Sequence, residues 1–393
     1  MLVNWKIPYF RHDLGRAELE SLACVLDGEI LTTGDAVSAF EAKFAAYLGQ
    51  RHALGVTSCT AALHMALLAL DIGPGDEVIT TPMSFVATAT AILEAGATPV
   101  FIDVESDTGN LDVSRVEAAI TSRTKAILPV HLYGLMCDMH ALKAIAVRYG
   151  LRIIEDAAHC IEGTRDGIRP GELSDAACFS FYATKNLTCG EGGAITVNDD
   201  ALAQRLNLLR LHGMTRMARE TAREGYQHWD MVIMGWKYNM SNIEAALLLP
   251  QFNRMRDKLA RRHALAERYD RAFANIDGIE VPSSRSNSVH ARHVYTIWCH
   301  GCARDHLLAH LHTERIGAVV NYRPIHLMSY FRKRYGYRAG DFPISEQIGN
   351  STISLPFYPD MPLNDVDVVV EAAARFLGRS HQQQGFVGRE RRA

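Results

Sequence analysis

From residue 53 to residue 155, short apolar segments alternate with helical ones, and this pattern constrains the fold more than any other feature. Because short turns join the successive segments, the pattern predicts an α/β domain with a mostly parallel sheet. Two later strand-like segments, 177–181 and 194–197, leave no room for a helix between them, so part of the sheet is expected to be antiparallel. The other expected strands are 53–56, 77–80, 99–104, 125–130 and 151–155, and the expected helices are 61–70, 86–95 and 139–149.

The chain has 393 residues, which is enough for more than one domain. We predict a large domain over 1–250 and a smaller α+β domain over 251–378, bridged by a helical tract from Ile243 to about Phe273. The tail 379–393 is rich in Gln, Arg and Gly and is predicted to be disordered. The smaller domain is expected to contain a strand at 294–299 and helices at 304–315 and 364–377.

The formal net charge of −3 gives the protein no overall basic field, so neither a nucleic acid nor a membrane surface is expected as a partner. No segment approaches the roughly 18 apolar residues of a membrane span, and the first residues do not read as a signal peptide. The eight cysteines lie mostly in apolar segments of a large chain, which favours reduced thiols. These features predict a cytoplasmic protein that acts on small molecules.

Lys185 follows the apolar segment 177–181 and precedes a glycine-rich turn. Asp156 follows another apolar segment, so an amine and a carboxylate are both expected at strand ends. An isolated lysine is usually a solvated surface charge. Pyridoxal phosphate (PLP), however, needs a lysine to bind its aldehyde and an aspartate to keep its ring nitrogen protonated. The two residues together therefore predict a PLP site.

Other residues fit the same cofactor. Ser58 and Thr60 begin a helix, whose free N–H groups and dipole favour a phosphate, although ordinary helix capping explains them equally well. Ser180 stands five residues before Lys185 and could contact the phosphate. Phe85 could stack on the ring or belong to the core, and His159 could donate to the phenolic oxygen or be structural.

Four segments, 58–63, 155–159, 179–186 and 235–241, occur in an order that resembles the DegT family of PLP-dependent nucleotide-sugar aminotransferases. The likeness runs from Ile7 to about Leu377, and the pattern at 185–193 is most similar to that of the UDP-4-amino-4-deoxy-L-arabinose aminotransferases. The resemblance implies the fold-type I architecture, with a mixed, mostly parallel seven-stranded sheet and a smaller C-terminal domain. It also implies a homodimer whose active sites are shared between subunits.

The resemblance assigns further roles. Lys185 and Asp156 become the catalytic pair, and Asn239 reaches the phosphate of the partner subunit's cofactor, although a turn or helix cap also explains an asparagine there. Thr33 and His326 fall where the substrate is bound. Cys59 lies in the phosphate loop, where many relatives carry Gly or Ala, so details of that loop are left open.

The implied reaction is transamination from L-glutamate to a nucleotide-linked 4-keto-sugar, giving a 4-amino sugar for surface polysaccharide synthesis. Two related substrates, a 3-keto-sugar and a keto-cyclitol, are alternatives. A related branch of enzymes that removes a hydroxyl has histidine in place of the lysine, so Lys185 favours transamination. A PLP-binding regulator is a further alternative, but no basic DNA-binding segment is evident.

One segment imitates a metal site. Cys299 and Cys302 are followed by His306 and His310, a spacing that resembles zinc ligands. The apolar strand at 294–299 and the edge of an amphipathic helix explain these residues without a ligand. No metal is therefore expected.

Overall fold

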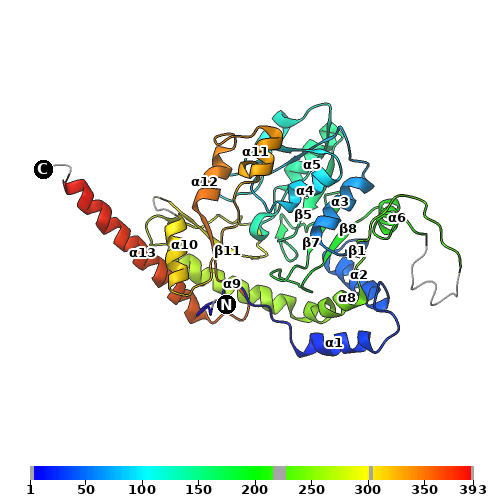
Figure 1. The fold of residues 1–393 in the computed structure, drawn as a ribbon, viewed down its shortest axis with the longest axis horizontal. Coiled ribbons are helices and arrows are strands. Elements are labelled where there is room, and N and C mark those ends of the chain that lie inside the picture. Colours follow the sequence, from blue (N-terminus) through cyan, green and yellow to red (C-terminus); the bar gives the residue numbers. More distant parts are fainter. Residues whose placement is uncertain (1–3, 216–226, 301–303, 391–393) are drawn as a thin grey trace.

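The computed structural model describes residues 4–215, 227–300 and 304–390, the last twelve of these by their backbone alone (Figure 1). A seven-stranded sheet runs in the order β1-β8-β7-β5-β4-β2-β3. Strand β8 is antiparallel to both β1 and β7, and the other pairings are parallel, which confirms the predicted mixed sheet. The strands are β1 (His52–Val56), β2 (Glu77–Thr80), β3 (Thr98–Phe101), β4 (Thr124–Ile127), β5 (Arg152–Asp156), β7 (Ala176–Ser180) and β8 (Gly193–Val197).

Helices cover both faces of this sheet, and β7 shows why its sequence is continuously apolar. Cys178 packs into a core with helix α3 (Cys59–Ala69), whereas its neighbours Ala177 and Phe179 pack into another with helix α2 (Asp35–Leu48). Successive strand residues point to opposite faces, so a strand between two helical layers has no polar side. The remaining helices near the sheet are α1 (Arg16–Leu26), α4 (Ala87–Glu94), α5 (Met139–Tyr149) and α6 (Asp200–Leu209).

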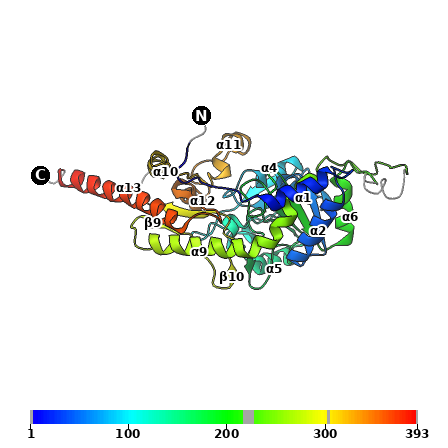
Figure 2. The same cartoon turned by 90° about the horizontal axis from the view of Figure 1, so that it is seen from below.

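The predicted helical tract from Ile243 to about Phe273 is not one continuous α-helix. The segment is divided into α8 (Asn242–Leu248), a 3-10 turn η4 (Leu249–Arg254) and α9 (Met255–Phe273). Pro250 lies at the start of η4, where its missing N–H and its ring prevent the α-helix from continuing. Helix α9 then runs along one side of the molecule toward the C-terminal region (Figure 2).

The C-terminal region has its own sheet and core. Strand β11 (Tyr295–Cys299) pairs antiparallel with β12 (Thr352–Leu355) and β9 (Ile279–Glu280). Tyr269 of α9, Tyr295 and Leu307 share an apolar core that also includes Ile7 from the N-terminal segment. The division at residue 250 stays a prediction.

The other elements are α10 (Arg304–Thr313), α11 (Ser329–Tyr335), α12 (Pro343–Ser351), α13 (Leu363–Glu390), β6 (Thr164–Arg165), β10 (Ser288–Val289), η1 (Val113–Arg115), η2 (Glu117–Ala119), η3 (Leu132–Gly134) and η5 (Ile325–Leu327).

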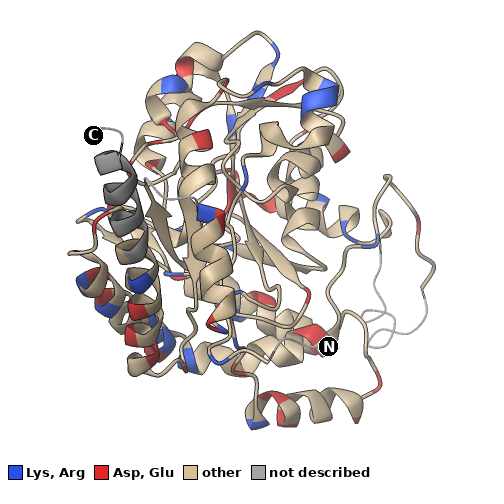
Figure 3. Ribbon diagram, turned by 60° about the vertical axis from the view of Figure 1, so that its left-hand side comes forward, with Lys and Arg blue, Asp and Glu red and all other residues tan. Residues whose placement is uncertain are grey.

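Helix α13 continues to Glu390 and extends away from the rest of the chain (Figure 1), and the disorder expected for the tail 379–393 stays a prediction. Within the described residues, no helix is both long and apolar enough to cross a membrane. Acidic and basic residues are interspersed along the described elements (Figure 3), as the small net charge suggests.

Candidate active site

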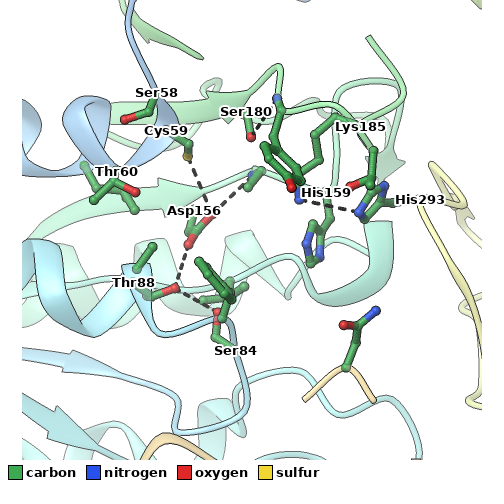
Figure 4. Close-up of a pocket in the computed structure, with 18 of the residues that line it drawn as sticks. Ser58, Cys59, Thr60, Ser84, Thr88, Asp156, His159, Ser180, Lys185 and His293 are labelled. Carbon is green, nitrogen blue, oxygen red and sulfur yellow. Dashed lines mark hydrogen bonds between the residues drawn. The ribbon is translucent and has the colours of Figure 1, made fainter. Parts of the chain in front are cut away.

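A cavity of about 530 Å³ lies where β5 and β7 end, which is within the usual size of small-molecule sites (Figure 4). All of the residues predicted to bind the cofactor line this cavity, except Asn239. Residues distant in the sequence therefore meet at one place. The predicted residues in the lining are Ser58, Cys59, Thr60, Phe85, Asp156, His159, Ser180 and Lys185.

The start of α3 forms one wall. Ser58 is the N-cap, and its hydroxyl accepts a hydrogen bond from the N–H of Ala61 at 3.1 Å while the residue also lines the cavity. Cys59 and Thr60 open the helix, so their N–H groups have no acceptor within it and the positive end of the dipole faces this region. A side chain at Gly193 would come within 2.4 Å of the Ser58 carbonyl carbon, so glycine permits β8 to pass this close.

Asp156, the last residue of β5, is buried at the cavity wall and its carboxylate is held on both oxygens. Oδ2 accepts from the Thr88 hydroxyl at 2.7 Å, and Oδ1 accepts from the N–H of Ala158 at 3.2 Å. Because Thr88 gives its proton to the carboxylate, the Ser84 hydroxyl, 2.8 Å away, donates to Thr88. The Cys59 thiol lies 4.0 Å from Oδ1. Burial raises the pKa of Asp156, and these hydrogen bonds oppose that rise.

A buried ion pair supports the backbone beside Asp156. His131 Nε2 lies 2.6 Å from Glu155 Oε2, and the other oxygen of Glu155 accepts from the N–H of Gly171 at 2.8 Å. Burial acts to lower the pKa of His131, but hydrogen bonds with Cys137 and Glu155 raise it to about 10. The N–H of His131 also donates to the carbonyl of Asp156 at 3.1 Å, which fixes the end of β5.

Lys185 points its amine into the cavity, where Nζ lies 3.4 Å from His293 Nε2 (Figure 4). Its backbone N–H donates to the carbonyl of Tyr182 at 2.8 Å, which closes the turn after β7. Burial lowers the pKa of Lys185 to about 8, against the opposing influence of Cys59 and Asp156. The amine is therefore a better base and nucleophile at neutral pH than an exposed lysine.

His159 is engaged at both ring nitrogens. Nδ1 accepts from the N–H of Tyr133 at 3.3 Å, so Nε2 carries the proton and faces the hydroxyl of Tyr322 at 3.1 Å. Burial and the nearby Lys185 hold its pKa well below the ordinary value, so the ring is neutral. To donate to the cofactor's phenolic oxygen, as predicted, His159 would have to give up the hydrogen bond between its Nε2 and the Tyr322 hydroxyl.

Phe85 and Ser180 are placed differently from each other. Phe85 is 58% exposed at the cavity wall, with its ring 6.1 Å from that of Tyr322, so the alternative of a core aromatic is wrong. Ser180, the last residue of β7, is buried, and its hydroxyl accepts from the N–H of Tyr182 at 3.3 Å. Phe85 is therefore accessible to a ligand, whereas Ser180 reaches the cavity from inside the sheet.

Three predicted residues do not line this cavity. Asn239 Nδ2 donates to the Thr33 hydroxyl at 2.7 Å, and that hydroxyl donates to the carbonyl of Met240 at 2.7 Å. His326 is fully buried, with Nε2 3.0 Å from Glu346 Oε1. His326 has no exposed surface in this chain, so its predicted contact with the substrate stays a prediction. Thr33 likewise makes no contribution to the cavity of its own chain.

Several residues of the lining were not predicted from the sequence, and Thr88, His293 and Tyr322 are three that make polar contacts there. The contact between Thr88 and Ser84 could have been predicted from the sequence, because the two residues are four positions apart near the start of a helix. Side chains with that spacing lie on one face of a helix. His293 and Tyr322 lie 108 and 137 positions after Lys185, and nothing in their own neighbourhoods marks them. The tertiary fold alone brings them to the amine.

The zinc-like segment differs from the expectation in one respect. Cys299 is in a disulfide, so the reduced thiols that the sequence favours do not hold at this residue. Cys302 lies outside the described residues. His310 Nε2 is 3.1 Å from the carbonyl of Ala372. Within the residues that the structure describes, no three His, Cys, Asp or Glu side chains are placed to hold a metal ion.

Comparison with known proteins fits this arrangement. The model of the DegT/DnrJ/EryC1/StrS aminotransferase family matches residues 12–374. The chain belongs to this family. It is 42% identical to the spore coat polysaccharide biosynthesis protein SpsC of Bacillus subtilis (strain 168), over 94% of this chain and 96% of SpsC.

Solved structures agree with the family assignment. S. venezuelae DesV superposes with a TM-score of 0.86 at 35% identity, covering 92% of this chain and 94% of DesV. Spr1654 of Streptococcus pneumoniae, in its PMP form, gives a TM-score of 0.90 at 29% identity over 95% of this chain and all of that one. Spr1654 has also been solved in a PLP form. The protein is a sugar aminotransferase of fold type I that uses PLP.

The cavity of this DegT-family chain fits PLP. A buried amine, a buried carboxylate and the positive end of a helix are the three groups that an aldehyde, a ring nitrogen and a phosphate require. All three groups line one cavity.

Proposed function

We propose that this protein transfers the amino group of L-glutamate to a nucleotide-linked 4-keto-sugar in the cytoplasm, giving a 4-amino sugar for a surface polysaccharide. The observation that carries the proposal is the single cavity that brings Lys185 and Asp156 together with the start of α3. The pattern at 185–193 favours carbon 4. The similarity to SpsC, a polysaccharide biosynthesis protein, supports the polysaccharide product.

In this proposal PLP supplies an electron sink that makes the donor's α-proton removable. Lys185 would bind the cofactor aldehyde, and its Nζ would carry the proton taken from the donor. With a pKa of about 8, roughly a tenth of the amine is neutral at pH 7, on the order of 300 times the neutral fraction of an ordinary lysine. Asp156 keeps the proton on the ring nitrogen, and Thr88 and Ala158 orient its carboxylate.

The remaining residues bind and orient. Ser58, Cys59, Thr60 and Ser180 would hold the phosphate at the start of α3. Phe85, exposed at the cavity wall, would lie against the ring.

The decisive experiment follows the absorbance of the holoprotein, first with L-glutamate and then with keto-sugars. We expect the visible band of the lysine-bound cofactor to be replaced by a near-ultraviolet band on addition of L-glutamate, and to return with the correct acceptor. A panel of nucleotide-linked 4-keto-sugars, 3-keto-sugars and keto-cyclitols distinguishes the proposed substrate from the two alternatives. Recovery of the visible band with a 3-keto-sugar or a keto-cyclitol alone would reject the 4-keto assignment.

We also propose a homodimer in which Asn239 acts on the partner subunit's cofactor. Asn239 and Thr33 are paired to each other outside the cavity of their own chain. Exposed apolar side chains lie close before Asn239 in the sequence, at Trp229, Met231 and Met234. Such a cluster of exposed apolar residues is typical of a protein interface.

Mixing two inactive variants tests this arrangement. A dimer of one Lys185→Ala chain and one Asn239→Ala chain contains one intact site if Asn239 acts across the interface, and none if it acts within its own chain. We therefore expect the mixture, after subunit exchange, to regain up to about a quarter of wild-type activity, since about half of the dimers are mixed and each has one site of two. No recovery despite mixed dimers on native mass spectrometry would refute the shared site.

A further inference from the structure

His293 touches the amine of Lys185 from a distant part of the chain. It lies just before β11, and its Nε2 is 3.4 Å from Lys185 Nζ (Figure 4). The side chain lines the cavity although the residue is only 8% exposed. Its backbone N–H donates to the carbonyl of Tyr133 at 3.1 Å. The imidazole is thus held against the amine by the fold.

Stability does not explain a histidine at this position. The other ring nitrogen, Nδ1, is buried and has no hydrogen-bond partner among the described residues. A buried polar atom without a partner destabilises a fold. The ring packs on His159, with centroids 4.4 Å apart, and a phenylalanine could make that contact without an unsatisfied nitrogen. What phenylalanine cannot supply is the acceptor at Nε2.

The segments that carry the two residues are joined by a buried clamp. Asn186, next to Lys185, donates through Nδ2 to the carbonyl of Ala291 at 3.0 Å and to Glu162 Oε2 at 2.9 Å. Arg262 donates through Nε to the same carbonyl at 3.3 Å and forms an ion pair with Glu162. Ala291 precedes His293 by two residues. The clamp therefore fixes both the turn that carries Lys185 and the segment that carries His293. The backbone thus holds the two side chains next to each other.

We propose that His293 is a positioning residue for Lys185: its neutral imidazole accepts a hydrogen bond from Nζ and stabilises the ammonium formed when Lys185 takes the donor's α-proton. The inference rests on the proposed role of Lys185 as the proton carrier. Burial, with Lys185, His159 and Arg262 nearby, holds the pKa of His293 well below its ordinary value, so the ring stays neutral beside an ammonium. The proton arrives on Nζ and leaves from Nζ, and His293 gains and loses none.

The first test needs neither substrate nor turnover. The pH dependence of Lys185 carbamylation by cyanate is measured in the apoprotein by peptide mass spectrometry, for wild type, His293→Phe, His293→Gln and His64→Phe. His64 is a buried histidine in α3 outside the cavity lining and controls for the exchange itself. Other titratable or charged side chains that line the spaces around Lys185 are Cys59, Asp156, His159, Tyr182, Glu191, Tyr9, Tyr322, Arg11, His12, Asp13, Lys258 and Arg262.

We expect the wild-type midpoint near pH 8. Loss of the acceptor destabilises the ammonium, so His293→Phe should move the midpoint down by about 0.5 to 1 pH unit. His293→Gln, which can place an amide oxygen near the position of Nε2, should restore most of the shift, and His64→Phe should cause none. A midpoint in His293→Phe that equals or exceeds the wild-type value would overturn the proposal, whatever the substrate of the enzyme proves to be.

The second test separates positioning from packing. In a single half-reaction with saturating L-glutamate, His293→Phe should be slower by roughly 10- to 100-fold, with little change in the donor concentration at half-maximal rate. Its melting temperature should not fall, because the replacement removes a buried atom without a partner. If the rate is unchanged, or if the melting temperature falls and His293→Gln restores neither rate nor titration, His293 is a packing residue and the inference is wrong.

Discussion

Replacing Lys185 by alanine should abolish transamination, lowering the rate by at least about 10⁴-fold, and should remove the visible band of the lysine-bound cofactor. In the proposed mechanism the amine is the nucleophile that binds the cofactor aldehyde and the base that carries the proton, and no other lysine lines the cavity among the described residues. Reduction of the wild-type holoprotein with borohydride, followed by peptide mapping, should place the cofactor on the peptide that contains residue 185.

Two further variants define what is lost. Lys185→Arg keeps a positive charge but is not a nucleophile, so it should be as inactive as Lys185→Ala. Lys125 is exposed on β4 of the same sheet, and Lys125→Ala should behave like wild type. Substantial activity in Lys185→Arg, or a reduced cofactor attached to another lysine, would show that Lys185 is not the residue that binds PLP.

The same variant predicts a pH-dependent stability difference. The pKa of Lys185 falls from 10.5 to about 8 on folding because burial disfavours the ammonium. Between these two pH values the unfolded chain binds more protons than the folded one, so stability rises with pH there. The penalty is fully present below pH 8 and absent above pH 10.5. The Lys185→Ala apoprotein should therefore melt at a higher temperature than wild type at pH 7, and the gap should close as the pH rises.

Residues at the ends of strands were predictable because one rule places them. The carboxyl ends of parallel strands meet at one edge of a sheet, and β5 and β7 are neighbours, so Asp156 at the end of β5 and the lysine after β7 lie near each other. The same rule located the start of α3, since a helix that follows a strand begins at that edge. The sequence therefore predicted the sheet and the meeting of Lys185, Asp156 and the start of α3 at one cavity, whereas their roles stay predictions.

The rest of the site depends on contacts that local pattern does not encode. His293 reaches Lys185 because the C-terminal region folds back over the large sheet, and its neighbours in sequence are typical of an ordinary strand start. Pro250 shows a different limit: it stands within the predicted helical tract, and its missing N–H and its ring interrupt the α-helix there. His326 has a suggestive place in the sequence, yet its partner Glu346 holds it in the interior.

Asp156→Asn should lower the rate of the half-reaction by about 10²- to 10³-fold, the usual effect of removing one charged group aimed at a site of developing charge. Asparagine has nearly the same shape and can still accept from Thr88, so the loss reports on charge and not on packing. The Lys185 amine provides an independent readout, because the Asp156 carboxylate raises the pKa of that amine. Carbamylation of Lys185 in Asp156→Asn apoprotein should therefore have a lower midpoint than in wild type.

Thr88→Val should also lower the rate of the half-reaction, by less than Asp156→Asn does. A hydrogen bond to a charged group contributes about 1.5–3 kcal/mol, which corresponds to a rate loss of roughly 10- to 100-fold. Burial already raises the pKa of Asp156, and loss of the Thr88 hydroxyl should raise it further, so the acid limb of the activity profile should move to higher pH. Thr88→Ser should restore both. Thr80→Val removes an equally buried hydroxyl, bonded to the carbonyl of Leu128 at 2.8 Å, and should affect stability without moving the acid limb.

A cofactor analogue methylated at the ring nitrogen decides whether Asp156 acts through that nitrogen. The methyl group makes the ring permanently cationic, so a carboxylate is no longer needed to hold a proton there. Asp156→Ala, which leaves space for the methyl group, should be more active with the analogue than with PLP, whereas wild type should be less active with it. If the analogue gives Asp156→Ala no advantage, the carboxylate acts elsewhere. The chain Ser84–Thr88–Asp156 would then be a structural support for the end of β5 and not part of the chemistry.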